Sequence, residues 1–286
     1  MNDKMKNLTV RTLSGIVFLL IVVGAALWAK VGFGILLGLV MVGSIVEFYQ
    51  LCRAKGYAPL RGIGVGTAVA IFGLSLIVFM NYGAEVDAQM GRLALGILLF
   101  LLLIVPTAFV CELWHNSPTP IANVATTFAG VIYIALPLSL MLFIPLLIGN
   151  GEWKPWTALC YFAIIWVNDI FAYLVGVGVG RRRMCKRISP KKSWEGFFGG
   201  VVAAIGAGIL CGHLLGENLL LWGGLAAVVA VTGVAGDFVE SLFKRAAGVK
   251  DSGNIMPGHG GVLDRFDALI ISAPYAFAYL LIVGNL

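Results

Sequence analysis

Charged residues are scarce in this chain. Asp, Glu, Lys and Arg make up 12% of its 286 residues, whereas apolar residues make up 60%. Soluble globular domains carry about 25% charged residues, so this composition excludes an ordinary soluble domain. No long polar linker or low-complexity tail interrupts the apolar sequence. We therefore expect an integral membrane protein of the all-α class that crosses the bilayer many times.

Several common functional motifs are also missing. The five cysteines are scattered, so we expect neither disulfides nor a thiolate metal site. The segment 176–180, GVGVG, is not followed by the Gly-Lys-Ser/Thr of a phosphate-binding Walker loop. The net charge of +6 comes without the aromatic residues or modules that bind DNA or RNA. We predict no nucleic-acid partner.

Nine apolar segments are long enough to cross a bilayer as helices, which needs about 20 residues each. The first is too long for a typical secretory signal and is expected to stay uncleaved. The fifth contains Pro137 and Pro145, which predicts either a kink or a short interfacial helix before it. The nine expected spans are 12–29, 32–51, 63–82, 93–111, 124–148, 157–178, 195–215, 219–243 and 268–284.

The distribution of basic residues supports this topology. With nine crossings, all but three of the 20 Lys and Arg residues fall on the side of the N-terminus. The exceptions are Lys30, Arg92 and Lys154. The positive-inside rule places the basic side in the cytoplasm. We therefore predict a multi-pass protein of the cell membrane with a cytoplasmic N-terminus and a basic face suited to lipid phosphates and nucleotides.

Polar chemistry is concentrated in the stretch 241–267, SLFKRAAGVKDSGNIMPGHGGVLDRFD. On a helix, Asp237, Ser241 and Lys244 share one face, because they are four and three residues apart. Asp264 and Asp267 are three residues apart and share a face as well. Polar residues near the bilayer are costly and tend to mark function. Acids that bind hard cations, beside cations that bind phosphate, indicate a metal-assisted phosphate site.

This stretch resembles the signature of the phosphatidate cytidylyltransferases, also called CDP-diacylglycerol synthases. Met256 departs from the family's usual Leu, Ile or Phe, which is a mild exchange between apolar side chains. The segment 189–196, SPKKSWEG, and the pair Asn168–Asp169 also resemble the family. The residues that match the signature at its spacing are Ser241, Lys244, Arg245, Lys250, Asp251, His259, Gly260, Gly261, Asp264, Arg265 and Asp267.

The resemblance implies transfer of a cytidylyl group from CTP to phosphatidic acid, which gives CDP-diacylglycerol and pyrophosphate for phospholipid biosynthesis. It assigns metal binding to Asp237, Asp264 and Asp267, which implies a Mg²⁺ cofactor and leaves a second cation open. Lys244 and Arg245 complete the expected catalytic set. The residues expected to contact substrate or cofactor are Ser241, Lys191, Lys192, His259, Gly260, Gly261, Asn168, Asp169 and Arg265.

Each acidic residue also has a purely structural interpretation. Asp237 could pair with Lys244 or Arg245 at a helix end, and Glu240 could join the site or face water. Asp264 and Asp267 could cap a helix, because acids are favoured at helix N-termini. The Asn168–Asp169 pair could form a buried hydrogen bond between helices. His259 could be a hydrogen-bonding residue in a turn. Glu47, near the cytoplasmic end of the second span, could reach towards water and is interpreted as mostly structural.

The basic segment 181–192 has two expected roles. Arg181, Arg182 and Arg183 are interpreted mainly as determinants of topology that contact the lipid surface. Ser189 and Pro190 are predicted to cap and begin a helix. Lys191 and the adjoining lysine would then hold a triphosphate at that helix start.

Two alternatives to this function remain open. A related enzyme could use another lipid acceptor, such as an isoprenoid phosphate, or act as a CTP-dependent polyprenol kinase. A transporter of anions or lipids could also use a basic cavity, although we see no inverted repeat. The candidate catalytic and binding residues lie in the last 120 or so residues, so we divide the chain into N-terminal helices (1–120) and a catalytic region (121–286). The sequence leaves open whether the protein forms a homodimer.

Overall fold

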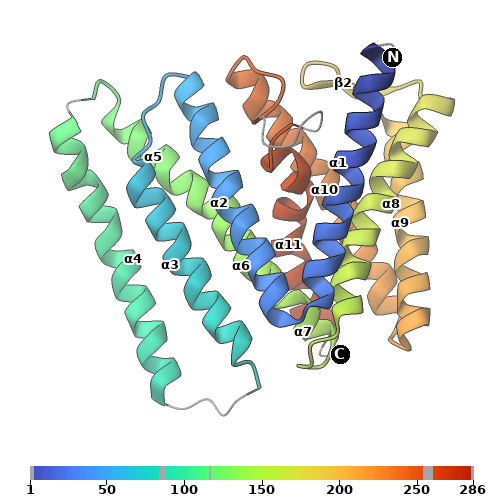
Figure 1. Ribbon diagram of the computed structural model, residues 1–286, viewed down its shortest axis with the longest axis horizontal. Coiled ribbons are helices and arrows are strands. Elements are labelled where there is room, and N and C mark those ends of the chain that lie inside the picture. The colour runs from blue at the N-terminus through green and yellow to red at the C-terminus, as the bar shows by residue number, and fades with distance from the viewer. Residues whose placement is uncertain (1–2, 84–87, 116, 254–259, 285–286) are drawn as a thin grey trace.

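The computed structural model describes residues 3–83, 88–115, 117–253 and 260–284, which form a bundle of helices (Figure 1). In chain order the elements are α1 (Asp3–Leu27), α2 (Lys30–Ala54), α3 (Arg61–Met80), α4 (Ala88–His115), α5 (Pro120–Gly130), the π-helix η1 (Val131–Ala135), α6 (Leu136–Met141), α7 (Ile144–Ile148), α8 (Pro155–Val179), β1 (Arg183–Cys185), β2 (Ser189–Ser193), α9 (Trp194–Leu215), α10 (Leu219–Ala246) and α11 (Leu263–Val283).

The prediction of an all-α, multi-span membrane protein is confirmed. In the described residues, seven helical segments are long and apolar enough to cross a membrane. The helices α1 and α4 contain shorter apolar stretches, Thr12–Leu27 and Leu99–His115, so the count of nine spans stays a prediction. The division of the chain at residue 120 also stays a prediction.

The expected distortion of the fifth span is a break into α5, η1, α6 and α7. Pro137 and Pro145 each lie in the first turn of a short helix, where the missing backbone N–H is tolerated. The last predicted span, 268–284, corresponds to helix α11, which begins earlier, at Leu263. Asp264 and Asp267 therefore belong to its first turns.

Helices α8, α9, α10 and α11 pack against one another in sequence and form the part of the bundle that carries the polar residues. Helix α2 contacts α11, while α3 and α4 lie at the far edge (Figure 1). The start of α1, the β1–β2 hairpin, the end of α10 and the start of α11 lie at one end, which we call the hairpin end (Figure 1). The basic segments of the sequence therefore gather at a common end of the fold.

Small residues allow α8, α9 and α10 to approach closely. A side chain at Gly196 or Gly200 of α9 would collide with the backbone of α8, at Ala172 and Asn168 respectively. Further along α9, Gly208 packs on the backbone of Trp222 of α10, and Gly212 packs on the Trp222 side chain. This close packing fixes the spacing between the helices that carry Asp169 and Asp237.

The segment before α9 departs from the sequence-based prediction. Ser189 and Pro190 do not begin a helix, because they lie in strand β2, which pairs antiparallel with β1. The N-cap of α9 is Ser193, whose Oγ accepts a hydrogen bond from the Gly196 N–H. The hairpin pairs Arg183 with Ser193 and so holds the two lysines of β2 above the bundle.

Candidate active site

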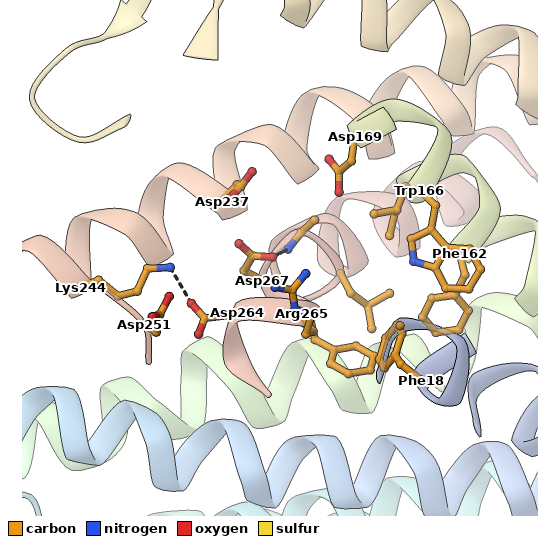
Figure 2. Close-up of a pocket in the computed structure, with 15 residues that line it drawn as sticks. Phe18, Phe162, Trp166, Asp169, Asp237, Lys244, Asp251, Asp264, Arg265 and Asp267 are labelled. Carbon is orange, nitrogen blue, oxygen red and sulfur yellow. Dashed lines mark hydrogen bonds and ion pairs between the residues drawn. The ribbon is translucent and has the colours of Figure 1, made fainter. Parts of the chain in front are cut away.

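A cavity of about 430 Å³ lies between α1, α8, α10 and α11, and we call it the aspartate cavity. Figure 2 shows the carboxylates of Asp169, Asp237 and Asp267 pointing towards this space from three different helices. Lys244, Arg265 and Asp264 line the cavity beside them. Its other wall is apolar and includes Phe18, Phe162 and Trp166. Small-molecule sites commonly have such a volume and a few convergent polar groups.

A second cavity, of about 440 Å³, lies between the hairpin and helices α8, α9 and α10, and we call it the hairpin cavity. It shares Asp169 and Asp237 with the aspartate cavity, so the two spaces meet at these carboxylates. Basic residues of the hairpin line one side, and apolar side chains such as Tyr173 line the other. A charged molecule with an apolar portion fits this combination of walls.

Asp237 is paired with Lys192, which reaches down from strand β2. The Lys192 ammonium also lies 4.8 Å from the ring centroid of Phe238, over its face. The sequence suggested Lys244 or Arg245 as the partner of Asp237, and the structure corrects this. The pair joins the hairpin to α10 at the boundary between the two cavities.

Lys244 instead pairs with Glu240 on its own helix and with Asp264 on α11. Its Nζ donates to Asp264 Oδ1 at 2.6 Å. Glu240 is buried beside Lys244, so the alternative that it faces water is wrong. One mostly buried cation therefore links two helices through two carboxylates.

The second oxygen of Asp264 organises the segment around it. Asp264 Oδ2 accepts hydrogen bonds from the Ser252 N–H at 2.9 Å, the Ser252 hydroxyl at 3.0 Å and the Gly261 N–H at 2.8 Å. Gly260 has a φ of 86°, a left-handed conformation that favours glycine. The expected shaped turn is confirmed at Gly260, while His259 lies outside the described residues.

Asp267 lies three residues further along α11 and is buried. Its Oδ1 accepts a hydrogen bond from the Ala268 N–H at 2.8 Å, and its carboxylate faces Asp237 across the cavity. Asp169 also interacts with Asp237, and the charges of Lys192 and Arg265 act on it. Three acids therefore surround one space, where their like charges repel unless cations lie between them.

Some predicted site residues lie elsewhere. Among the described residues, Ser241, Arg245 and Asn168 line neither cavity. The Asn168 side chain is buried where α8 packs on Gly200, but its Oδ1 has no hydrogen-bond partner among the described residues, so the alternative of a buried hydrogen bond between helices is not supported there. Lys191 is exposed and lines the hairpin cavity.

The oxygens of Asp169, Asp237 and Asp267 are the ligand type that Mg²⁺ prefers. In the described residues, however, no three or more acidic, His or Cys side chains are already arranged to hold a metal. The pair with Lys192 occupies Asp237, and four donors occupy Asp264. The donor chemistry fits a magnesium ion, provided that Lys192 releases Asp237.

Comparison with known proteins connects this arrangement to a family. The model of the cytidylyltransferase family matches residues 9–283, which is nearly the whole chain. The chain belongs to this family. The family predicted from the signature is thereby confirmed, together with its class of CTP-dependent nucleotidyltransferases.

Relatives named phosphatidate cytidylyltransferase align with half of this chain or more. The phosphatidate cytidylyltransferase of Haemophilus influenzae is 32% identical over 289 residues, which covers 94% of this chain and 96% of the relative. The enzyme of the same name from Synechocystis is 30% identical over 284 residues, covering 88% and 89%. The one from Aquifex aeolicus is 40% identical over 152 residues, covering 51% and 54%.

Glu47 has structural contacts that the sequence did not indicate. The possibility that it reaches towards water is wrong, because its side chain is 2% exposed and hydrogen bonded to the segment before α11. An acid with no signature residue nearby in sequence gives no sign of such a contact. Its one unusual feature in the sequence is that a charged residue interrupts the apolar run of α2.

Proposed function

We propose that this protein transfers a cytidylyl group from CTP to phosphatidic acid. An oxygen of the lipid phosphate attacks the α-phosphorus of CTP. The bond from that phosphorus to the oxygen bridging to the β-phosphate breaks, and pyrophosphate leaves. The products are CDP-diacylglycerol and pyrophosphate. The observation that carries the proposal is the aspartate cavity, where carboxylates and cations meet in a chain of this family.

The residues needed for this reaction are mainly electrostatic. A lipid phosphate is already an anion, so the reaction needs no strong general base. The obstacle is repulsion between that anion and the triphosphate, together with charge that develops on the departing pyrophosphate. Lys192, Lys244 and Arg265 provide fixed positive charge around the shared space. Lys191 lies further out and would meet the distal phosphates.

Asp237 and Asp267 would hold Mg²⁺, with Asp169 as the nearest additional carboxylate and Asp264 as the link to Lys244. A bound divalent ion supplies neutralisation of phosphate charge and alignment of the attacking and leaving oxygens. Lys192, which pairs with Asp237 in this structure, would be free to bind a phosphate oxygen when Asp237 holds the ion. Asp264 keeps its place because Lys244 and the loop hold it.

The two cavities suggest how a soluble nucleotide meets a bilayer lipid. The hairpin cavity is bordered by Tyr173 and Val177 of α8, which are 69% and 71% exposed, so this wall faces the lipid in a membrane. The part of this cavity near Asp169 and Asp237 would hold the phosphate of phosphatidic acid, while Lys191 would meet the distal phosphates of CTP further out. The aspartate cavity would then hold the reacting part of CTP.

We further propose that the hairpin end faces the cytoplasm of a bacterial cell, where CTP is available. The support is the gathering of basic segments at that end. Single cysteines at Lys186 and Lys250, in a cysteine-free background, should resist a membrane-impermeant maleimide in intact cells and react after permeabilisation. Efficient labelling from outside would show that the hairpin end faces the other side of the membrane.

Whether the protein works as a homodimer is a separate proposal, which the mass of the purified detergent complex tests.

The deciding experiment uses purified protein in liposomes that contain phosphatidic acid. CTP labelled at the α-phosphate should place label in CDP-diacylglycerol, and CTP labelled at the γ-phosphate should place it in pyrophosphate. Label passing from the γ-phosphate to a polyprenol would indicate a kinase instead. Product formed from an isoprenoid phosphate in preference to phosphatidic acid would assign another acceptor. Absence of any product, with uptake of label into the liposomes, would favour a transporter.

A further inference from the structure

A buried acid from the other side of the bundle holds the segment that carries the signature. Glu47 lies near the end of α2, more than 200 residues away in sequence from its partners, and its side chain is 2% exposed. In the described residues no Lys, Arg or His forms an ion pair with it. Burying a carboxylate is costly unless it is well hydrogen bonded, so hydrogen-bond donors must compensate for the burial of Glu47.

Three donors satisfy the Glu47 carboxylate. Its Oε1 accepts from the Val262 N–H at 2.9 Å, and its Oε2 accepts from the Leu263 N–H at 2.9 Å. The Ser252 hydroxyl donates to Oε2 at 2.8 Å. The two backbone donors are the N-cap and first residue of α11, and α11 has no capping side chain of its own. Glu47 therefore caps α11 from another helix, where orphan N–H groups and the helix dipole favour a negative charge.

The same carboxylate contacts both described sides of the segment between α10 and α11. Ser252 lies before residues 254–259, and Gly261 lies after them. A side chain on Gly261 would collide with Glu47 Oε2 and with Ser252 Oγ. The absence of a Cβ at Gly261 therefore lets the parts of the chain before and after residues 254–259 both lie against Glu47.

A short chain of contacts leads from Glu47 to the cavity. Ser252 is shared between Glu47 and Asp264, since its hydroxyl lies 2.8 Å from Glu47 Oε2 and 3.0 Å from Asp264 Oδ2. Asp264 in turn binds Lys244. Asp267 lies four residues after Leu263, so the helix start that Glu47 caps is about one turn from Asp267.

We propose that Glu47 is a positioning residue for nucleotidyl transfer, which acts by capping α11 and by holding Ser252 against Asp264. The inference rests on the proposed function, because it concerns the alignment of the residues assigned to that reaction. Glu47 lines neither the aspartate cavity nor the hairpin cavity. A displacement of about 1 Å at a reacting centre can cost about 100-fold in rate, so a capping residue outside the cavity can control turnover.

The test compares Glu47→Gln with a matched control, Glu112→Gln. Glu112 is also buried near the end of a helix in the N-terminal half, where its Oε1 accepts from Asn123 Nδ2 at 2.6 Å, away from the signature segment. We expect Glu47→Gln to lower kcat about 10- to 100-fold, with the KM for CTP changed less than about 3-fold. Glu112→Gln should leave both constants of the folded enzyme within about 3-fold of the parent.

A double-mutant cycle separates positioning from general structural support. Glu47→Gln and Ser252→Ala should be strongly non-additive in kcat, because both interrupt one chain of contacts. Glu112→Gln and Ser252→Ala should be additive. If Glu47→Gln does not accumulate as folded protein, the Ser252→Ala variant alone should still lower kcat, since it removes the shared hydroxyl and leaves Glu47 in place.

Hydrogen exchange provides a measurement that does not depend on catalysis. Amides at the start of α11 should exchange faster in Glu47→Gln than in the parent, and Glu112→Gln should leave them unchanged. A parent protein that forms no CDP-diacylglycerol would refute the proposed function, while this exchange result would still decide whether Glu47 caps α11. Normal kcat in Glu47→Gln, or unchanged exchange at α11, would overturn the proposal.

Discussion

The two ion pairs that border the aspartate cavity differ in how firmly they are held. On the hairpin side, Lys192 and Asp237 are 28% and 38% exposed, and Lys192 is supplied by a strand. On the signature side, Lys244 and Asp264 are 12% and 7% exposed and belong to a larger network. An exposed pair gains little from its mutual attraction, whereas a buried charge that loses its partner is strongly destabilising.

This difference suggests that the two ion pairs have different roles in the site. The Lys192–Asp237 pair can open at modest cost, so its two members are free to exchange each other for a phosphate and a cation. The Lys244–Asp264 pair is fixed by Glu240, Ser252 and, one step further, by Glu47. We interpret the signature side as the rigid frame and the hairpin side as the part that responds to substrate.

The largest effect on turnover is expected at the exchangeable acid. Asp237→Asn should lower activity by about 10²–10³-fold, since one removed electrostatic group in a reaction centre costs about that much. Folded stability should stay near that of the parent, because Asp237 is only partly buried. Turnover with labelled CTP, together with thermal unfolding in detergent, measures both.

A matched variant on α11 tests whether the acids work as one unit. Asp267→Asn should cause a similar loss, and the double variant should be little worse than either single one. Activity within about 3-fold of the parent, under 1 kcal/mol of barrier, would remove the substituted residue from the proposed metal site.

Asp264→Asn should differ from Asp237→Asn in its effect on stability. The change leaves Lys244 with one carboxylate fewer and weakens three hydrogen bonds from the signature segment. Breaking a buried pair costs about 3–5 kcal/mol, so the variant should unfold at a clearly lower temperature and also lose turnover. Equal unfolding temperatures for Asp264→Asn and Asp237→Asn would remove the distinction between a rigid side and an exchangeable side.

A smaller, substrate-dependent effect is expected for Lys192→Gln. A charge-assisted phosphate contact is worth about 1.5–3 kcal/mol, which corresponds to about 10- to 100-fold in turnover at low CTP. Kinetics over a range of CTP and phosphatidic acid concentrations would show which substrate the lysine contacts. If Lys191→Gln/Lys192→Gln has the CTP and lipid kinetics of the parent, the hairpin holds no phosphate, and the signature side must bind substrate alone.

The sequence predicted the components of the site better than their pairing. Asp264 and Asp267 share a face by helical periodicity, and Asp237 follows from the position of the preceding span. The contact of Lys192 with Asp237 joins residues 45 apart in the chain. This contact depends on the β1–β2 hairpin, whereas the sequence predicted that a helix begins in that segment. Ser189 and Pro190 can begin a helix by local preference, and strand pairing with β1 decides against it.

Glu47 shows a second limit of sequence reasoning. Local patterns identify residues that share a helix face, but they do not identify a partner more than 200 residues away. The clue available in advance was that an acid near a bilayer is costly unless it has a role. Which role it has depends on how α2 packs against α11, and that packing is set by apolar surfaces along both helices.

The smallest effect is expected at the base of the hairpin. The N–H groups of Arg181 and Arg182 donate to the Glu195 carboxylate, while their side chains are exposed. Backbone bonds survive a change of side chain, so the double substitution Arg181→Gln/Arg182→Gln should leave kcat and KM within about 3-fold of the parent. Loss of two positive charges from one side of a membrane protein weakens its orientation signal, so the amount of inserted protein should fall. The comparison requires equal amounts of correctly inserted enzyme. A tenfold loss of CTP turnover in that matched protein would extend the substrate-responsive region to the base of the hairpin, beyond the Lys192–Asp237 pair.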